Sequence, residues 1–175
     1  MRILVGFATT EGHTRTLARF IADRLIKGGH HVTLADLGQP GAPDPAAFER
    51  AFLAASLHMS RYQRPFVDFA RRHHATLNAM PAAFVSVSLS AAGNAPSDRA
   101  GLAACVARLT ADTGWTPTAI HYAAGAMPFR AYGWLKKLAI WLIVRRHGLK
   151  VRISEDYVLT DYAAVGRFAE EFAGG

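Results

Sequence analysis

Short apolar runs alternate with helix-length segments along this chain of 175 residues, and the alternation constrains the fold more than any other feature. Strands are predicted at 3–7, 31–35, 51–56, 82–89 and 119–123. Helices are predicted at 14–27, 65–77, 97–113 and 161–172. Strands that alternate with helices are typical of a parallel sheet covered on both faces. The sequence therefore predicts one α/β domain over 1–175, a doubly wound, five-stranded parallel sheet of order 2-1-3-4-5.

The first strand leads through a hydroxyl-rich turn directly into a helix, and the turn consists of Thr9, Thr10, Glu11, Gly12, His13 and Thr14. This order leaves backbone N–H groups at the positive end of a helix dipole, where phosphate binds. The turn lacks both the lysine of a P-loop and the three spaced glycines of a dinucleotide fingerprint. The turn therefore predicts a bound phosphate monoester that is held in place and is not transferred. The alternative is a threonine N-cap on an ordinary helix.

Three further loops, 57–62, 88–94 and 124–128, follow the carboxyl ends of predicted strands, the edge where ligands bind in doubly wound sheets. The loop 57–62 carries Met59 and Tyr62, which are suited to covering a flat ring. The loop 88–94 is small and polar, so its backbone amides can approach a ligand. The alternative is that each loop is only solvated.

The basic excess of the chain lies in one segment, residues 127–152. Net charge is +7, and outside this segment 13 basic residues match the 13 acidic ones. The segment contains seven consecutive apolar residues, Leu138–Val144, which as a helix cover about 10 Å and cannot span a ~30 Å membrane core. Such a pattern predicts contact with an anionic membrane surface through Trp134, Lys136, Lys137, Trp141, Arg145 and Arg146. The alternatives are a buried helix with charged ends and a dimer contact in a homo-oligomer.

Composition excludes several other classes of protein. The single cysteine, Cys105, excludes a disulfide framework and any Cys-rich metal site, and its apolar neighbours predict a buried thiol on a helix. The N-terminal apolar run is too short for a signal peptide, which favours the cytoplasm. Because the basic residues are localised and not diffuse, no nucleic-acid partner is predicted. No metal site is predicted either.

Several segments together resemble the flavodoxin-like, quinone-dependent protoporphyrinogen oxidases of bacteria. The turn Thr9–Thr14 is similar to the FMN phosphate loop of flavodoxins. The more specific matches are Leu-Asn-Ala-Met-Pro at 77–81 and the position of the insertion at about 127–152. The resemblance also includes the segments 55–62, 69–75, 86–89, 115–117, 124–126 and 157–161.

The resemblance implies a flavodoxin-like fold with a helical insertion after the fifth strand, one bound FMN, and oxidation of protoporphyrinogen IX with transfer of electrons to a membrane quinone. It places the protein in the cytoplasm, peripheral on the inner face of the cell membrane. It implies that FMN lies against the turn and against Ser56, Leu57, His58, Met59, Tyr62, Ser88, Leu89, Ser90, Ala124 and Gly125.

The chain departs from this family at the loop 90–95, which in the family can be longer and richer in lysine and arginine. The porphyrin propionates would then be held by Arg61, Arg64 or Arg130. No catalytic base is assigned, although His13 and His58 lie near the expected flavin. Two other functions stay open: a flavodoxin-like electron carrier, which the positive charge disfavours, and a non-enzymatic module that binds a membrane or a partner.

Overall fold

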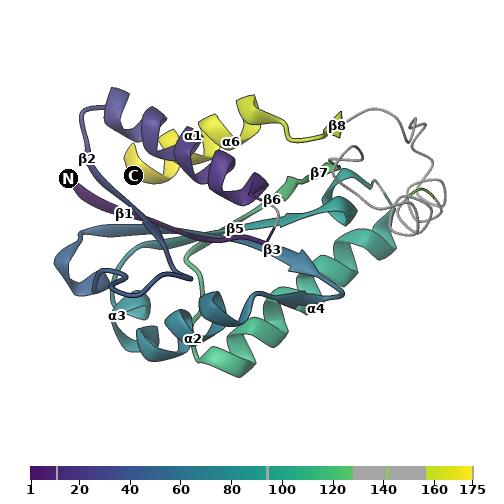
Figure 1. Cartoon of the computed structure of the whole chain (residues 1–175), viewed down its shortest axis with the longest axis horizontal. Helices are drawn as coiled ribbons and strands as arrows, with labels where there is room; N and C mark the ends of the chain where they lie inside the picture. The colour runs from purple at the N-terminus through teal and green to yellow at the C-terminus, as the bar shows by residue number, and fades with distance from the viewer. Residues whose placement is uncertain (11, 94, 128–140, 142–156, 175) are drawn as a thin grey trace.

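The computed structural model describes residues 1–10, 12–93, 95–127, 141 and 157–174. A twisted parallel sheet forms its centre (Figure 1), with neighbouring strands in the order β2-β1-β3-β5-β6. The strands are β1 (Arg2–Ala8), β2 (His31–Asp36), β3 (Arg50–His58), β5 (Ala82–Ser88) and β6 (Ala119–Ala124). The short strand β4 (Arg61–Tyr62) pairs only with β3, so it does not count among the five strands of the parallel order. The predicted order 2-1-3-4-5 and the doubly wound α/β class are therefore confirmed.

Helices cover both faces of the sheet (Figure 1). One face carries α1 (His13–Lys27) and α6 (Tyr162–Gly174). The opposite face carries α2 (Arg64–Arg72), α3 (His74–Asn78) and α4 (Pro96–Thr113). Two 3-10 turns, η1 (Pro45–Ala47) and η2 (Leu89–Ala92), lie in the connections.

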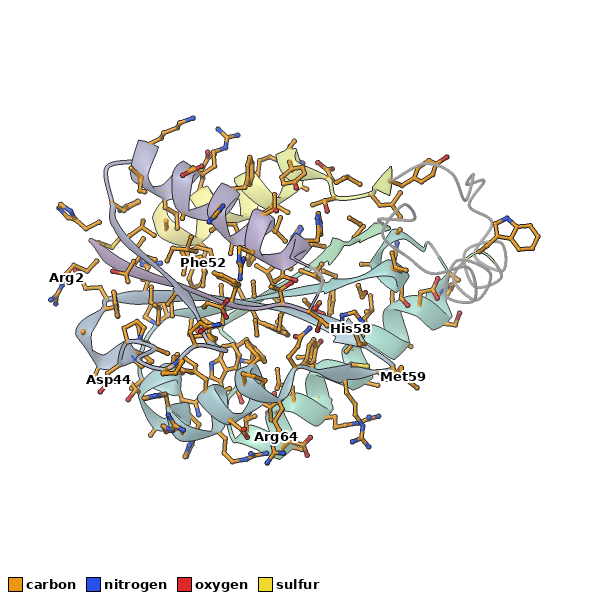
Figure 2. The ribbon with its side chains drawn as sticks, viewed as in Figure 1. Arg2, Asp44, Phe52, His58, Met59 and Arg64 are labelled. Atoms are coloured by element: carbon orange, nitrogen blue, oxygen red, sulfur yellow. The ribbon has the colours of Figure 1, made fainter. Side chains whose placement is uncertain are left out.

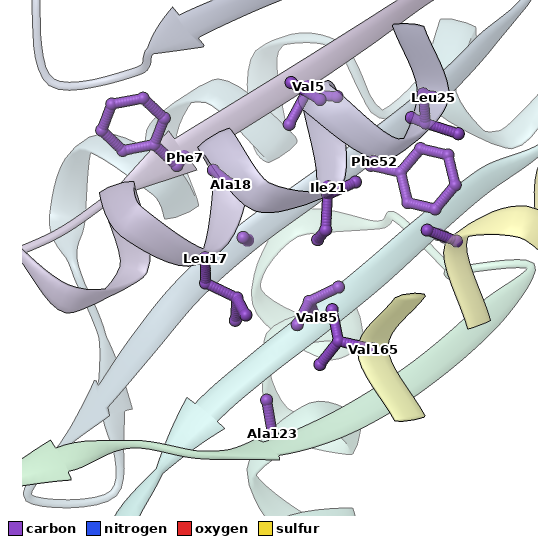
Figure 3. Packing of buried hydrophobic residues seen from close by; sticks show 14 of the residues in the cluster. Val5, Phe7, Leu17, Ala18, Ile21, Leu25, Phe52, Val85, Ala123 and Val165 are labelled. Carbon is purple, nitrogen blue, oxygen red and sulfur yellow. The ribbon is translucent and has the colours of Figure 1, made fainter. Parts of the chain in front are cut away.

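The core is divided between the two faces because successive strand side chains point in opposite directions. Under α1 and α6, Val5 and Phe7 of β1 pack with Phe52, Val85 and helical side chains such as Leu17 and Ile21 (Figure 3). Under α2 and α4, the next residues along the same strands, Leu4, Leu53 and Phe84, pack around Trp115. Both sides of β1, β3 and β5 are buried, so these strands read as nearly continuous apolar runs in the sequence.

The prediction of one helix over 65–77 is wrong, because the helix is divided at His73. His73 has φ −109° and ψ 15°, outside the helical region. The Nδ1 atom of His74 donates to the Arg71 carbonyl at 2.8 Å, and in a continuous helix that carbonyl would accept from the backbone N–H of Ala75. The side chain therefore competes with the helix for its own acceptor. The last helix, α6, begins directly after Asp161, whose Oδ1 accepts from the N–H of Ala164 at 2.9 Å and so acts as an N-cap.

A two-stranded antiparallel ribbon, β7 (Ala126–Met127) with β8 (Tyr157–Val158), brings together the chain on either side of the predicted insertion. Almost all of the insertion lies outside the described residues, including Arg130, Trp134, Lys136, Lys137, Arg145 and Arg146. Trp141 is described and is a half-buried helical residue. Among the helices that the structure describes, none is both long and apolar enough to cross a bilayer.

Candidate functional site

Parallel register brings the predicted loops to one edge of the sheet. Ala8 pairs with Ala55, Ser56 pairs with Val87, and Ser88 pairs with Ala124, so β1, β3, β5 and β6 all end at this edge. The side chains that the sequence singled out after these strands therefore lie around one region. This is the ligand edge of a doubly wound sheet.

The hydroxyl-rich turn after β1 is held by its own side chain. The backbone N–H of Gly12 donates to Thr9 Oγ1 at 2.9 Å. Gly12 has φ +88°, which side chains other than glycine rarely adopt, and a Cβ there would meet nothing within 4 Å. Glycine is therefore required by the backbone conformation and not by space. Thr14 is buried at 1% exposure in the first turn of α1, and Glu11 lies outside the described residues.

The arrangement of the turn fits a phosphate monoester. Because Thr9 Oγ1 already accepts from Gly12, its own hydrogen remains to be donated to an anion. The first N–H groups of α1 have no acceptors within the helix and carry the positive end of its dipole. Hydroxyl donors and a helix N-terminus without a lysine are suited to holding a phosphate monoester as a fixed group. Within the ranges that the structure describes, no group of three or more metal-ligating side chains is present.

A two-residue hairpin joins β3 to β4, with Leu57 opposite Tyr62 and His58 opposite Arg61. Its tip, Met59 and Ser60, has φ +48° and +61°, a conformation normally supplied by Asn-Gly. Met59 is 97% exposed, and the hairpin lies beside α4 (Figure 2). Backbone strain beneath a fully exposed apolar side chain favours a contact with a ligand over a role in stability.

Tyr62, the other group predicted to cover a flat ring, faces a different environment. Its hydroxyl is 2.9 Å from Ser86 Oγ, and its ring lies edge-on to Phe84 with centroids 5.1 Å apart. Burial raises the pKa of Tyr62 well above its ordinary value, so its hydroxyl stays protonated. The Met59 side chain is thus exposed to solvent, whereas the Tyr62 ring is partly buried against the aromatic cluster under the sheet. A flavin contact by either residue stays a prediction.

The loops after β5 and β6 are joined by a backbone hydrogen bond. Ser88 Oγ accepts from the N–H of Ala91 at 3.2 Å, which caps η2 and positions Leu89 and Ser90. The N–H of Gly125 donates to the Ser88 carbonyl at 3.0 Å. Ala124 is buried beside it. The two predicted cofactor segments therefore form one surface at the sheet edge.

His13 connects the phosphate-binding turn to the chain that follows the insertion. Its Nε2 is 2.7 Å from Thr160 Oγ1, and the Thr160 hydroxyl donates to the Ala124 carbonyl at 2.5 Å. A hydroxyl has one hydrogen, so Nε2 must be the donor to Thr160. Burial lowers the pKa of His13, which favours the neutral ring. Nδ1 is then the nitrogen of His13 that can accept a proton. The sequence alone did not identify Thr160 as the partner of His13.

Two of the three basic residues predicted to hold an acidic substrate, Arg61 and Arg64, are exposed, and the third, Arg130, lies outside the described residues. Arg61 is exposed on β4, and Arg64 Nε lies 3.6 Å from Asp68 Oδ2, with the Arg64 side chain 92% exposed (Figure 2). A further basic residue, which the sequence did not single out, is Arg108 of α4, whose Nη1 donates to the Ser60 carbonyl at 3.5 Å. His58 is exposed, with Nε2 3.4 Å from Ser56 Oγ.

The doubly wound sheet and the hydroxyl-rich turn at its ligand edge define a flavodoxin-like protein. Residues 4–152 match the family model described as flavodoxin domain. Flavodoxin 1 of Bacillus cereus superimposes with a TM-score of 0.58 at 13% identity, covering 99% of this chain and 98% of the flavodoxin. A flavodoxin of Streptococcus pneumoniae gives 0.58 at 17% identity over 99% of both chains. At these identities, the superpositions establish the fold.

The curated relatives are more specific. A protein of Escherichia coli K12 named protoporphyrinogen IX dehydrogenase (quinone) is 30% identical over 174 residues, covering 99% of this chain and 95% of the relative. A Leishmania major protein of the same name is 30% identical over 184 residues, covering 98% of this chain and 74% of the relative. The chain therefore belongs to the flavodoxin-like family of quinone-dependent protoporphyrinogen IX dehydrogenases, and the resemblance inferred from the sequence motifs is confirmed.

Proposed function

We propose that this chain catalyses the FMN-dependent oxidation of protoporphyrinogen IX to protoporphyrin IX in haem biosynthesis and passes the electrons to a membrane quinone. The observation that carries the proposal is the identity to dehydrogenases of this name over nearly the whole chain. The hydroxyl-rich turn at the ligand edge of the sheet supports it, because this turn supplies the donors that an FMN phosphate requires.

The chain's own residues bind and orient the reactants. Thr9, Thr10 and Thr14 would hold the phosphate of FMN. The hairpin at Met59 and the η2 loop would contact its ring. When bound, FMN supplies the two-electron acceptor chemistry that removes six electrons and six protons from the porphyrinogen in three steps. The substrate propionates are held by Arg61, Arg64 or Arg130. His13 Nδ1 is available to accept a released proton, since its Nε2 is engaged by Thr160.

Turnover of protoporphyrinogen IX with a soluble quinone analogue tests the proposal. The purified protein should be yellow, release FMN on denaturation, and produce porphyrin fluorescence only when quinone is supplied. Bound FMN without porphyrin formation would favour the flavodoxin-like electron carrier. A protein that binds no FMN would favour the non-enzymatic module.

We also propose that residues 127–152 dock the protein, from the cytoplasm, on the inner face of the cell membrane. The quinone that accepts the electrons lies in this membrane. The support is the sequence: all of the net charge of +7 lies in this segment, around seven apolar residues and two tryptophans. Each cation near an anionic surface contributes on the order of 1 kcal/mol, so several together can hold a protein without a spanning helix.

Replacing Lys136, Lys137, Arg145 and Arg146 by Gln should release the protein from anionic vesicles, and raising the salt concentration should do the same, because exposed charges are screened over about 8 Å at physiological ionic strength. Activity with lipid-embedded quinone should fall more than activity with a soluble analogue. The matched control removes four exposed cations elsewhere, Arg19, Lys27, Arg72 and Arg167. Vesicle co-sedimentation that responds equally to both sets, or to neither, would contradict a dedicated docking segment.

A further inference from the structure

The side chain of Gln63 joins two separate parts of the predicted cofactor site. Gln63 is the N-cap residue of α2, directly after the hairpin. Its Nε2 donates to Thr10 Oγ1 of the phosphate-binding turn at 3.4 Å and also donates to Ser56 Oγ at the end of β3. Thr10 lies 53 residues away along the chain. A single amide group therefore bridges the end of β3 to the turn after β1.

The orientation of this amide decides where the Thr10 hydroxyl can direct its hydrogen. An amide NH₂ carries two hydrogens, so Gln63 can donate to both hydroxyl oxygens at once. The Ser56 hydroxyl can then direct its own hydrogen to His58 Nε2, 3.4 Å away. The Thr10 hydroxyl, exposed and already accepting from Gln63, has its hydrogen left for a ligand. A phosphate oxygen accepts and does not donate, so this is the orientation that phosphate binding needs.

The amide is held in place at a cost to stability. Gln63 Oε1 is buried and has no hydrogen-bond partner. Turning the amide over would satisfy Oε1 with the two hydroxyls and leave the NH₂ group without partners in its place, so neither orientation removes the cost. The side chain is also not needed to begin α2: the Gln63 carbonyl accepts from the N–H of Val67 at 3.1 Å, and the side chain makes no cap hydrogen bond. A polar group that is costly and not required by the helix points to function.

We propose that Gln63 is a positioning residue that presents the Thr10 hydroxyl to the phosphate of FMN. The proposal rests on the proposed FMN binding. Because Gln63 acts through Thr10, its contribution belongs to the phosphate and not to the isoalloxazine ring. Gln63 therefore adds to the preference of the site for FMN over riboflavin, which has the same ring and no phosphate.

Binding of FMN and riboflavin to the apoprotein, followed by quenching of flavin fluorescence, tests this role. Gln63→Leu should weaken FMN binding about tenfold, the lower end of the effect of one hydrogen bond to a charged group, and should change riboflavin binding by less than about twofold. Thermal unfolding should occur at the same or a higher temperature, since the unpaired atom is removed. The matched control is Gln39→Leu, which changes the other glutamine of the chain, in an exposed loop, and should alter neither affinity.

A double-mutant cycle with Thr10→Val separates positioning from general structure. Since Gln63 acts through the Thr10 hydroxyl, Gln63→Leu should add little to the loss that Thr10→Val causes alone. Equal weakening of FMN and riboflavin, or losses that multiply in the double variant, would overturn the proposal. If Gln63→Leu does not fold, Gln63→Met takes its place in the same cycle. Wild-type protein that binds no flavin overturns the proposed function and this inference together, whereas tight FMN binding that Gln63 variants leave unchanged overturns the inference alone.

Discussion

Trp115→Ala is expected to lower the free energy of unfolding by about 3–5 kcal/mol, the range for removing a large aromatic side chain from a core. Trp115 is fully buried, and its ring centroid lies 5.8 Å from that of Phe84 and 6.2 Å from that of Phe66. Both neighbours also pack against Tyr62, so a cavity at Trp115 would loosen the aromatic cluster beneath the hairpin. Urea unfolding followed by circular dichroism measures the loss.

Trp115→Phe separates the loss of packing from the loss of the indole N–H. Trp115 Nε1 is buried without a hydrogen-bond partner, so removing it relieves an unfavourable group while the smaller ring leaves a smaller cavity. The expected loss is clearly less than that of Trp115→Ala. Equal losses for the two variants would mean that the N–H group contributes to stability through a partner such as a buried water.

The positions of the strands could be predicted from the sequence because each strand carries its signal within a few residues, and their order follows from the alternation with helices that is typical of doubly wound sheets. The runs that became β1, β3 and β5 are buried on both sides, so they stand out without any knowledge of their neighbours. The hairpin after β3 could not be predicted in this way. Its tip consists of Met59 and Ser60, and the Asn or Gly that normally marks two residues with positive φ is absent.

The division between α2 and α3 shows a similar limit. The apolar pattern over 65–77 is consistent with a single helix. In the structure α2 ends before His73, because the side chain of His74 donates to the carbonyl of Arg71. Whether a histidine turns its ring back onto the main chain depends on rotamer and packing, which the apolar pattern does not record.

The same limit applies to the candidate site, of which one part could be predicted from the sequence and another part could not. The turn at 9–14 could be predicted because strand, turn and helix are adjacent in the sequence, and its ligand class follows from the dipole and the hydroxyls. Gln63 and Thr160 could not, because their partners in the turn lie 53 and 147 residues away. Gln63 lies just outside the segments that carry the family resemblance, and Thr160, although it lies in the segment 157–161, carries no signal there for a contact with the turn. Contacts of this kind become visible only once the register of the sheet places the strand ends together.

Replacing both Thr9 and Thr14 by Val is expected to weaken FMN binding by roughly 10²- to 10⁴-fold. Each hydroxyl that donates to a charged acceptor contributes about 1.5–3 kcal/mol, so two contribute about 3–6 kcal/mol if they act independently. Valine keeps the shape of threonine, which matters at Thr14 because that side chain is 1% exposed. Thr9→Val also removes the acceptor for the Gly12 N–H and so loosens the turn itself.

Titration of the apoprotein with FMN and with riboflavin measures the effect, and the loss should be much larger for FMN. The matched control, Thr33→Val with Thr116→Val, removes two exposed hydroxyls outside the turn and should leave both affinities unchanged. Because the helix dipole and the backbone N–H groups of α1 remain, the doubly substituted protein should still prefer FMN to riboflavin by a reduced margin. Unchanged FMN affinity in the Thr9→Val/Thr14→Val protein would place the phosphate away from this turn, and the flavin site would then have to be sought at another edge of the sheet.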